Sequence, residues 1–318
     1  PVKLAVTQFS PVIPHNYKET SYPVAVYKWT AHNPGRRPAE LSVMLTWENM
    51  VGWAPRLKTP AREADFGWDR NVPGRVNEVV RDGRMTGVVF GRQGQNPRTG
   101  NAMSGTMCIA AESIPGKADV YVQADFDPRG DGADIWTPFA ADGTLPNRES
   151  SRTTGAQDAL AAALAVRLTL APGERVEFPI VVAWDFPYAE FETGVRHLRK
   201  HTAFFGESGR NAAAVAREAI AGWRGWERAV DEWQRTIVSD RDLPDWFKQA
   251  LINELYILPE TSVWDAATNL HTYLESADYL MYGTFDVDSY CWHVLKLWPE
   301  LEFENMRYFS RTVDLEDA

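Results

Sequence analysis

The stretch LAVRLTLAPGERVEFPIVVAW, residues 164–184, decides the fold class of this chain. Before its Pro172-Gly173 turn every second residue is apolar: Leu164, Val166, Leu168 and Leu170. After the turn the alternation resumes at Val176, Phe178, Ile180, Val182 and Trp184. A period of two places such residues on one face of a strand, and a Pro-Gly pair is a turn signal. The segment therefore predicts a β-hairpin with one buried face.

Similar short runs rich in β-branched and aromatic residues precede this segment. They are bounded by Pro, Asn and Gly, and they cover Val2–Phe9, Val24–Trp29, Leu41–Trp47, Gly87–Phe90 and Ala118–Val122. The run Ala161–Ala163 has helical propensity, but the period of two takes over after it. Many short strands separated by turn residues predict a β-sandwich.

The pattern changes near Pro187, where apolar residues begin to recur at three- and four-residue steps. The expected helices cover Thr193–Phe205, Asn211–Ile237, a run from Leu243-Pro244-Asp245 that Pro259 ends, Val287–Leu297, and a last helix from Glu304. Strands followed by helices predict separate β and α domains. We expect a β-sandwich over residues 1–190, a helical linker over 191–240 and the start of a helical domain over 241–318.

The last of these segments is too short to enclose a core of its own. The chain also opens on Pro1, without Met, directly before a predicted strand. We therefore expect a fragment whose two ends both lie inside a longer protein.

Composition excludes several classes of function. The net charge is −10 and there is no basic stripe, which argues against nucleic-acid binding. No apolar run reaches the roughly 18–20 residues of a membrane helix, and two distant cysteines form no disulfide framework. With 13 tryptophans the chain is rich in aromatic side chains, which suit either sugar binding or sandwich and helix cores.

Two groups of residues resemble metal ligands at first sight. His197 and His201 are four residues apart, which would place both on one face of the predicted helix, but the flanking cations Arg196, Arg199 and Lys200 oppose zinc. An acidic loop offers oxygen ligands for calcium, yet turn chemistry explains it equally well: Asp125, Asp127, Asp131 and Asp134. We predict no metal and no organic cofactor.

The densest cluster of chemically active residue types is HTYLESADYLMYGTFDVDSY, residues 271–290. It combines carboxylates with aromatic side chains and lies between two predicted helices, so it is a loop or a short ribbon. Glycoside hydrolysis uses two carboxyl groups on either side of the scissile bond. Without further information, a polar loop between helices explains the same residues.

Five segments resemble glycoside hydrolase family 116, the family of non-lysosomal glucosylceramidases and microbial β-glucosidases. They are FSPVIPHNYKETSYPVAVYKW (9–29), LSVMLTWENMVGW (41–53), LPDWFKQALINELYIL (243–258), YLESADYLMYGTFDVDSY (273–290) and LKLWPELE (295–302). The resemblance implies an N-terminal β-sandwich, a helical linker and the first helices of an (α/α)6 barrel.

The resemblance also assigns roles to residues. Glu275 of the Tyr-Leu-Glu motif is similar to the nucleophile, and Asp286 to a residue that hydrogen-bonds glucose in the −1 subsite. Tyr273, Tyr282 and Trp264 are weaker candidates for the walls of the pocket. The family's general acid/base is an Asp further downstream, beyond Ala318, so this chain alone is expected to be inactive.

The implied activity is hydrolysis of β-glucosides, glucosylceramide among them, by a retaining mechanism that needs no cofactor. A lipid substrate would require a peripheral membrane contact, and the expected location is the cytoplasm. The alternative is a non-catalytic module whose β-sandwich binds carbohydrate or has a structural role. Another (α/α)6 activity, on α-linked sugars, also stays open.

Overall fold

The computed structural model describes residues 1–55, 67–150, 152–190, 194–274 and 283–313. These form two compact units. Unit 1 comprises residues 1–10, 23–186 and 208–223. Unit 2 comprises residues 11–22, 187–207 and the chain from residue 224 onward.

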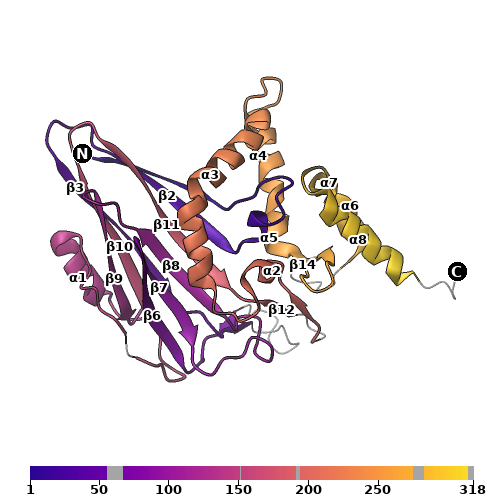
Figure 1. The fold of residues 1–318 in the computed structure, drawn as a ribbon, viewed down its shortest axis with the longest axis horizontal. Coiled ribbons are helices and arrows are strands. Elements are labelled where there is room, and N and C mark those ends of the chain that lie inside the picture. Colours follow the sequence, from indigo (N-terminus) through magenta and orange to yellow (C-terminus); the bar gives the residue numbers. More distant parts are fainter. Residues whose placement is uncertain (56–66, 151, 191–193, 275–282, 314–318) are drawn as a thin grey trace. The chain divides into compact units, whose positions relative to one another are not determined.

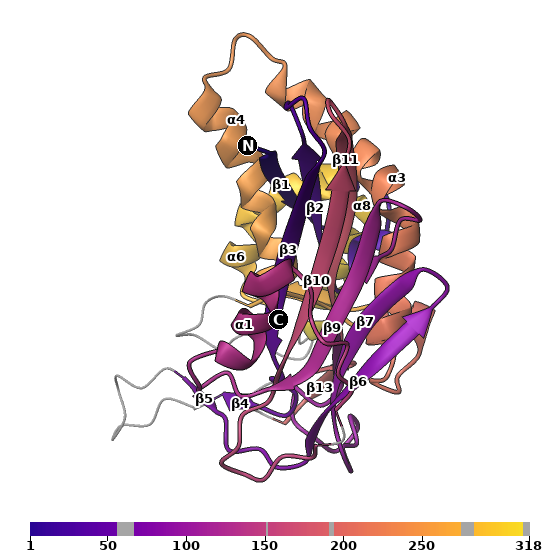
Figure 2. The same ribbon diagram turned by 90° about the vertical axis from the view of Figure 1, so that its left-hand side faces the viewer.

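Unit 1 contains two antiparallel sheets (Figures 1 and 2). The larger has the strand order β1 (Lys3–Phe9), β2 (Val24–His32), β11 (Arg175–Asp185), β8 (Thr106–Glu112), β7 (Met85–Arg92) and β6 (Arg75–Asp82). The smaller has the order β3 (Ala39–Glu48), β10 (Ala161–Leu170) and β9 (Ala118–Phe126). A short ribbon, β4 (Ala54–Pro55) with β5 (Trp68–Asp69), stands apart from both sheets.

The two strands predicted from residues 164–184 are confirmed, but the hairpin is wrong. Strand β10 pairs with β3 and β9, whereas β11 pairs with β2 and β8, so the Pro172-Gly173 turn joins one sheet to the other. The apolar faces of the two strands therefore meet across the core, and Leu164, Leu168 and Phe178 are fully buried in one cluster. Two sheets that share one apolar core have the arrangement of a β-sandwich.

A connection that joins a strand of one sheet to a strand of the other is called an arch here, and Asn33 contacts two of them. The connection from β2 to β3 passes between the same two sheets, and the Asn33 side chain donates to the carbonyls of Leu170 and Ala171. Its backbone N–H donates to Glu174, and its carbonyl accepts from Gly173. The two arches are thus tied at one end of the sandwich, which fixes the register of β2 against β11 and of β3 against β10.

The outer face of the smaller sheet is covered by α1 (Ala133–Asp142), a helix that the sequence pattern did not reveal (Figure 2). Ala161, Ala163 and Ala165 point to this side and contact a second cluster that contains Ile135 of the helix. Strand β10 therefore begins at Ala161, within the run whose propensity is helical. Small side chains on this face allow the helix to approach closely.

The first part of α3 (Ala212–Val238) belongs to unit 1 and lies on the other face of the larger sheet (Figure 1). The Asp185 carboxylate at the end of β11 accepts from the backbone N–H of Asn211, 2.8 Å away. The Thr106 hydroxyl at the start of β8 donates to the Gly209 carbonyl at 2.9 Å. A Cβ on Gly105 would lie 1.9 Å from the Asp185 carbonyl oxygen, so only glycine permits this close approach. The helix predicted over Asn211–Ile237 is confirmed.

Unit 2 is built mainly from short helices. They are a 3-10 turn (Glu19–Ser21), α2 (Thr202–Phe205), α4 (Asp245–Asn253), a second 3-10 turn (Glu254–Tyr256), α5 (Ile257–Thr261), α6 (Phe285–Tyr290), α7 (Trp292–Leu297) and α8 (Pro299–Thr312). Two small ribbons accompany them, β12 (Tyr188–Glu190) with β13 (Arg196–Leu198), and β14 (Ser262–Trp264) with β15 (His271–Tyr273).

Several predicted helix limits are wrong. Residues 196–198 form a strand, and only the end of the helix predicted over Thr193–Phe205 is helical. His197 therefore lies in β13 while His201 precedes α2, so the two do not share a helix face. Pro259 does not end its helix, because it falls in the first turn of α5, where the missing N–H has no partner to lose. The last helix starts at Pro299, and the preceding one is divided at Cys291.

The core of unit 2 brings an N-terminal segment against the last helices. Trp298 and Tyr273 are fully buried in a cluster with Cys291, Val294 and Leu301. The Trp298 indole donates to the carbonyl of Ile13 at 3.1 Å, and the N–H of His15 donates to Leu297 at 2.8 Å. Residues 11–22 are therefore part of this unit, although strands of unit 1 flank them in sequence.

Arg75 is the largest buried charge of unit 1, with 1% of its surface exposed. Its guanidinium donates to the carbonyls of Val72, Asn49 and Asp158. Burial lowers the pKa of Arg75, and the Glu48 carboxylate acts against that shift. The side chain stays protonated and satisfies three carbonyls in three different segments.

Replacement of Arg75 by Leu is expected to lower the free energy of unfolding by about 3 kcal/mol, because three buried carbonyls lose their donors. The measurement is urea unfolding at neutral pH. Arg81→Leu is the matched control, since Arg81 forms an exposed ion pair with Glu149, and its effect should stay below about 1 kcal/mol. Equal effects of the two substitutions would contradict the role given to Arg75.

Candidate functional site

The β14–β15 ribbon carries two of the residues that the sequence singled out. Trp264 pairs with His271, and Ser262 pairs with Tyr273. Beyond the paired residues, the N–H of Leu274 donates to Thr261 at 2.8 Å. Leu274 directly precedes Glu275 in sequence, so the backbone is anchored up to the residue before the predicted nucleophile.

The predicted site residues have different surroundings. Tyr273 is fully buried in the core of unit 2. Trp264 is half-buried and packs against the same core. Asp286 is exposed, at the second residue of α6. Glu275 and Tyr282 lie outside the described residues. The described residues thus bring Trp264 and Tyr273 onto one ribbon and do not place them with Asp286.

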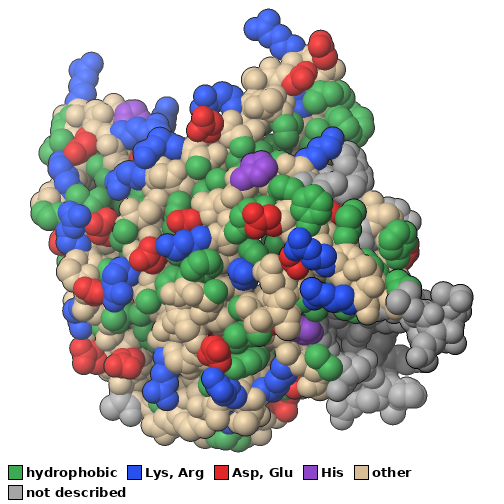
Figure 3. All heavy atoms as spheres, turned by 45° about the vertical axis from the view of Figure 1, so that its right-hand side comes forward, with side chains coloured by type: hydrophobic (Ala, Val, Ile, Leu, Met, Phe, Trp, Pro, Cys, Tyr) green, Lys and Arg blue, Asp and Glu red, His purple; other side chains and the backbone are tan. Residues whose placement is uncertain are grey.

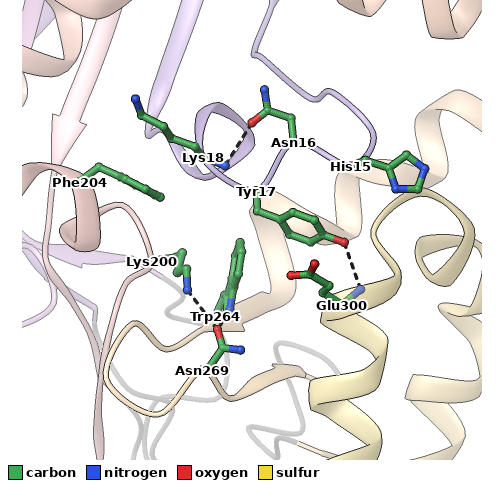
Figure 4. Close-up of a pocket in the computed structure, with 9 residues that line it drawn as sticks. All are labelled: His15, Asn16, Tyr17, Lys18, Lys200, Phe204, Trp264, Asn269 and Glu300. Atoms are coloured by element: carbon green, nitrogen blue, oxygen red, sulfur yellow. Dashed lines mark hydrogen bonds between the residues drawn. The ribbon is translucent and has the colours of Figure 1, made fainter.

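Trp264 is held by three partners from three parts of the chain (Figure 4). Its indole N–H donates to Asn269 Oδ1 at 2.9 Å. The Lys200 ammonium lies 4.3 Å from the centre of its ring, a cation–π contact. The ring of Tyr17 meets it edge-on, with 5.8 Å between ring centres. Trp264 is therefore held in place by side chains from three segments of the chain.

The turn between β14 and β15 is organised by the buried carboxylate of Asp265. It accepts hydrogen bonds from the N–H of Leu198 at 2.7 Å, and from both the N–H and the hydroxyl of Thr268. Burial acts to raise the pKa of Asp265, but these hydrogen bonds outweigh it and hold the pKa below the ordinary 3.8. The turn presents Asn269 with a positive φ of 60°, so its Oδ1 reaches both Trp264 and Lys200.

A cavity of about 680 Å³ opens beside this turn, within unit 2. Figure 4 draws the 9 residues that line it, from the N-terminal segment, the α2 region, the ribbon and α8. Of these, only Trp264 is among the site residues predicted from the sequence. The loop Pro14–Lys18 stood inside a family-like motif, which was the one signal that it could have a role beyond folding.

His271, the first residue of β15, is buried, with 1% of its surface exposed. Its ring meets Tyr273 edge-on, at 4.9 Å between centres. Among the described residues, neither ring nitrogen has a hydrogen-bond partner. Burial lowers the pKa of His271 to about 3, so the ring is neutral at physiological pH.

The acidic loop of unit 1 is explained by turns. Asp127 accepts from the N–H of Arg129 and Asp131 from that of Ala133, both at 3.0 Å. Hydrogen bonds from Arg129 hold the pKa of Asp127 below its ordinary value. Within the described part of the chain, no three His, Cys, Asp or Glu residues gather as a metal site would require.

Comparison with known families matches residues 1–226 to a family described as beta-glucosidase 2, glycosyl-hydrolase family 116 N-term. The chain belongs to glycoside hydrolase family 116. The match covers the sheets, α1 and the first part of α3, and it confirms the resemblance seen in the sequence. The predicted site residues all follow residue 226, so their roles in a family 116 enzyme remain predictions.

The face of this family 116 chain that Figure 3 draws carries mixed charge. On the face drawn in Figure 3, acidic and basic side chains are interspersed rather than gathered into separate areas. Through the described ranges, none of the helices has the length and hydrophobicity needed to cross a membrane.

Replacement of His271 by Phe is expected to stabilise the protein, by about 1 kcal/mol at pH 7, because two unpaired buried nitrogens are removed. The gain should grow as the pH falls. Between the ordinary pKa of 6.5 and the folded value of about 3, the unfolded chain takes up a proton that the folded chain does not. This difference in proton uptake increases the stability gain of the His271→Phe variant by at most about 1.4 kcal/mol per pH unit.

Urea unfolding at pH 7, 5.5 and 4 measures this difference. His32→Phe, at the end of β2 in unit 1, is the control for the removal of a histidine outside this core. A gain for His271→Phe that is constant or shrinks toward pH 4 would show that His271 is not the buried neutral group described above.

Proposed function

We propose that this chain is the front part of a retaining β-glucosidase in which Glu275 is the nucleophile. The family match supports the proposal, and the observation that carries it is the Tyr-Leu-Glu motif, which begins at Tyr273, the last residue of β15. In this proposal residues 1–190 are the β-sandwich domain, residues 191–240 a helical linker, and residues 241–318 the start of an (α/α)6 barrel. The helices of unit 2 would be the first elements of that barrel.

The proposed reaction is a double displacement. A Glu275 carboxylate oxygen attacks the anomeric carbon, a glycosyl ester forms, and the bond to the leaving alcohol breaks. A second carboxyl group, which the family supplies from an Asp downstream of this chain, protonates the leaving oxygen. The same group then deprotonates a water molecule, which releases the glucose with retained configuration.

The residues before Glu275 suit this role because they fix the backbone. Tyr273 is buried, and the N–H of Leu274 is hydrogen-bonded to Thr261. A nucleophile that follows such an anchored strand needs little reorganisation to reach the anomeric carbon. Asp286 would bind a glucose hydroxyl, and its exposed position on α6 leaves the carboxylate accessible. Tyr282 and Trp264 would contribute walls of the pocket.

The proposed substrates are β-glucosides, including glucosylceramide, which a cytoplasmic enzyme would meet through a peripheral membrane contact. The alternative of a carbohydrate-binding sandwich receives little support from unit 1. Its most exposed tryptophan, Trp136, has 59% of its surface accessible, but its ring is inclined by 40° to that of Phe139. The two rings do not form one flat platform for a sugar.

The complete protein that contains this chain should lose at least about 10³-fold in kcat on Glu275→Gln, because the amide cannot form the glycosyl ester. A mechanism-based β-glucosyl inactivator should label Glu275, as read by mass spectrometry of the labelled peptide. Glu260→Gln, an exposed glutamate in α5, is the control and should keep full activity. An active Glu275→Gln variant, or a label on another residue, would overturn the assignment.

A further inference from the structure

The cavity beside the β14–β15 turn holds hydrogen-bonding groups that the fold leaves available. The Lys200 ammonium donates to Asn269 Oδ1 at 3.0 Å, and among the described residues it has no carboxylate within ion-pair distance. Two of its three N–H groups are therefore available for other acceptors. The side-chain amide N–H₂ groups of Asn269 and Asn16 likewise have no acceptor within the described residues.

An acceptor faces these donors. Glu300 lies on the cavity wall, and its carboxylate makes no hydrogen bond or ion pair in the described part of the chain. Its backbone N–H donates to the Tyr17 hydroxyl at 3.1 Å, which leaves the hydroxyl hydrogen of Tyr17 available as a further donor. Figure 4 shows Lys200, Asn269 and Glu300 converging around Trp264, while His15 and the ammonium of Lys18 point away from that centre.

The lining holds two lysines and one glutamate, but the Lys18 ammonium points away from the centre of the cavity (Figure 4). Around Trp264 the charges are therefore one cation, Lys200, and one anion, Glu300, with amides and a phenol beside them. An anionic ligand would gain from Lys200 but would be repelled by Glu300. A hydroxyl group suits both partners, because it accepts from an ammonium or amide and donates to a carboxylate. Adjacent hydroxyls on a ring repeat that pattern, and aromatic walls complement the apolar faces of the ring. The Phe204 ring, 42% exposed, and Trp264 provide such walls.

We propose that this cavity binds a neutral saccharide through Lys200, Asn269 and Glu300, against Trp264 and Phe204. The cavity of about 680 Å³ is large enough for more than one pyranose ring. It lies at the turn end of the ribbon. Leu274 comes directly after the opposite end of β15. It is three residues after His271, which corresponds to about 10 Å along an extended strand. The residues proposed to bind the saccharide do not include Glu275, so saccharide binding is tested separately from the role of Glu275.

Titration of the 318-residue chain with cellobiose and with methyl β-glucoside, followed by ligand-observed NMR and calorimetry, tests the proposal. Binding in the millimolar range is expected. Lys200→Met keeps the apolar stem over Trp264 but removes the donors, and Glu300→Gln removes the charged acceptor. Each substitution should weaken binding about tenfold, as for the loss of one charged hydrogen bond.

Lys248→Met is the matched control, because Lys248 pairs with Asp245 on α4, outside the lining of the cavity. It should leave the affinity unchanged, and equal thermal midpoints for all variants would show that folding is intact. Inorganic phosphate is the anionic probe. No saccharide binding, saccharide binding that Lys200→Met leaves unchanged, or phosphate binding in place of saccharide would each overturn the proposal. The labelling of Glu275 is read separately, so the two proposals fail independently.

Discussion

A charged guanidinium sealed inside the sandwich is the constraint on which unit 1 depends. Arg75 stands at the first residue of β6 and binds carbonyls from the end of β3, from the loop before β6 and from the loop before β10. An isolated buried charge would be strongly unfavourable, so these three segments must all be in place before the side chain can be buried. The interaction thereby couples strands of both sheets at one end of the sandwich.

Neighbouring asparagines extend this coupling. The Asn49 amide lies 3.0 Å from the Asn77 side chain and 3.0 Å from the Gly91 carbonyl. The Asn77 amide in turn donates to Ala124 of the smaller sheet at 2.8 Å. Asn33 performs the same task in a separate network at the arches. Asparagine side chains thus bind backbone carbonyls of both sheets, and apolar side chains fill the space between the sheets.

Alternation in the sequence predicted much of unit 1, because one face of each strand is buried in the common core. It missed two strands of the larger sheet, β6 and β8. Strand β8 reads TMCIAAE, and nearly every residue is covered, so no alternation marks it. Alternation also cannot predict which strands pair, because the periodicity of β10 and β11 is the same whether the two strands form a hairpin or an arch. The tertiary pairing distinguishes the two arrangements, because β10 pairs with β3 and β9 whereas β11 pairs with β2 and β8.

The helical predictions were reliable for α3, which is long and strongly periodic, and poor for residues 193–205. There the strand β13 is fixed by the carboxylate of Asp265, 67 residues away from Leu198 in sequence. Trp264 shows the same limit in the candidate site. The family resemblance pointed to it, but the residues that hold it, Lys200 and Tyr17, come from segments that no local pattern connects to it.

The β14–β15 ribbon therefore has two ends of different character. At one end Tyr273 is buried in the core and the N–H of Leu274 is hydrogen-bonded to Thr261. At the other end the turn of Asp265 and Asn269 leaves donors and an acceptor around an open cavity. A rigid strand that connects a proposed nucleophile to a proposed sugar-binding turn can keep the spacing between them constant. For an enzyme whose substrate carries more than one recognition element, a constant spacing lets binding at one end of the ribbon orient the substrate at the other.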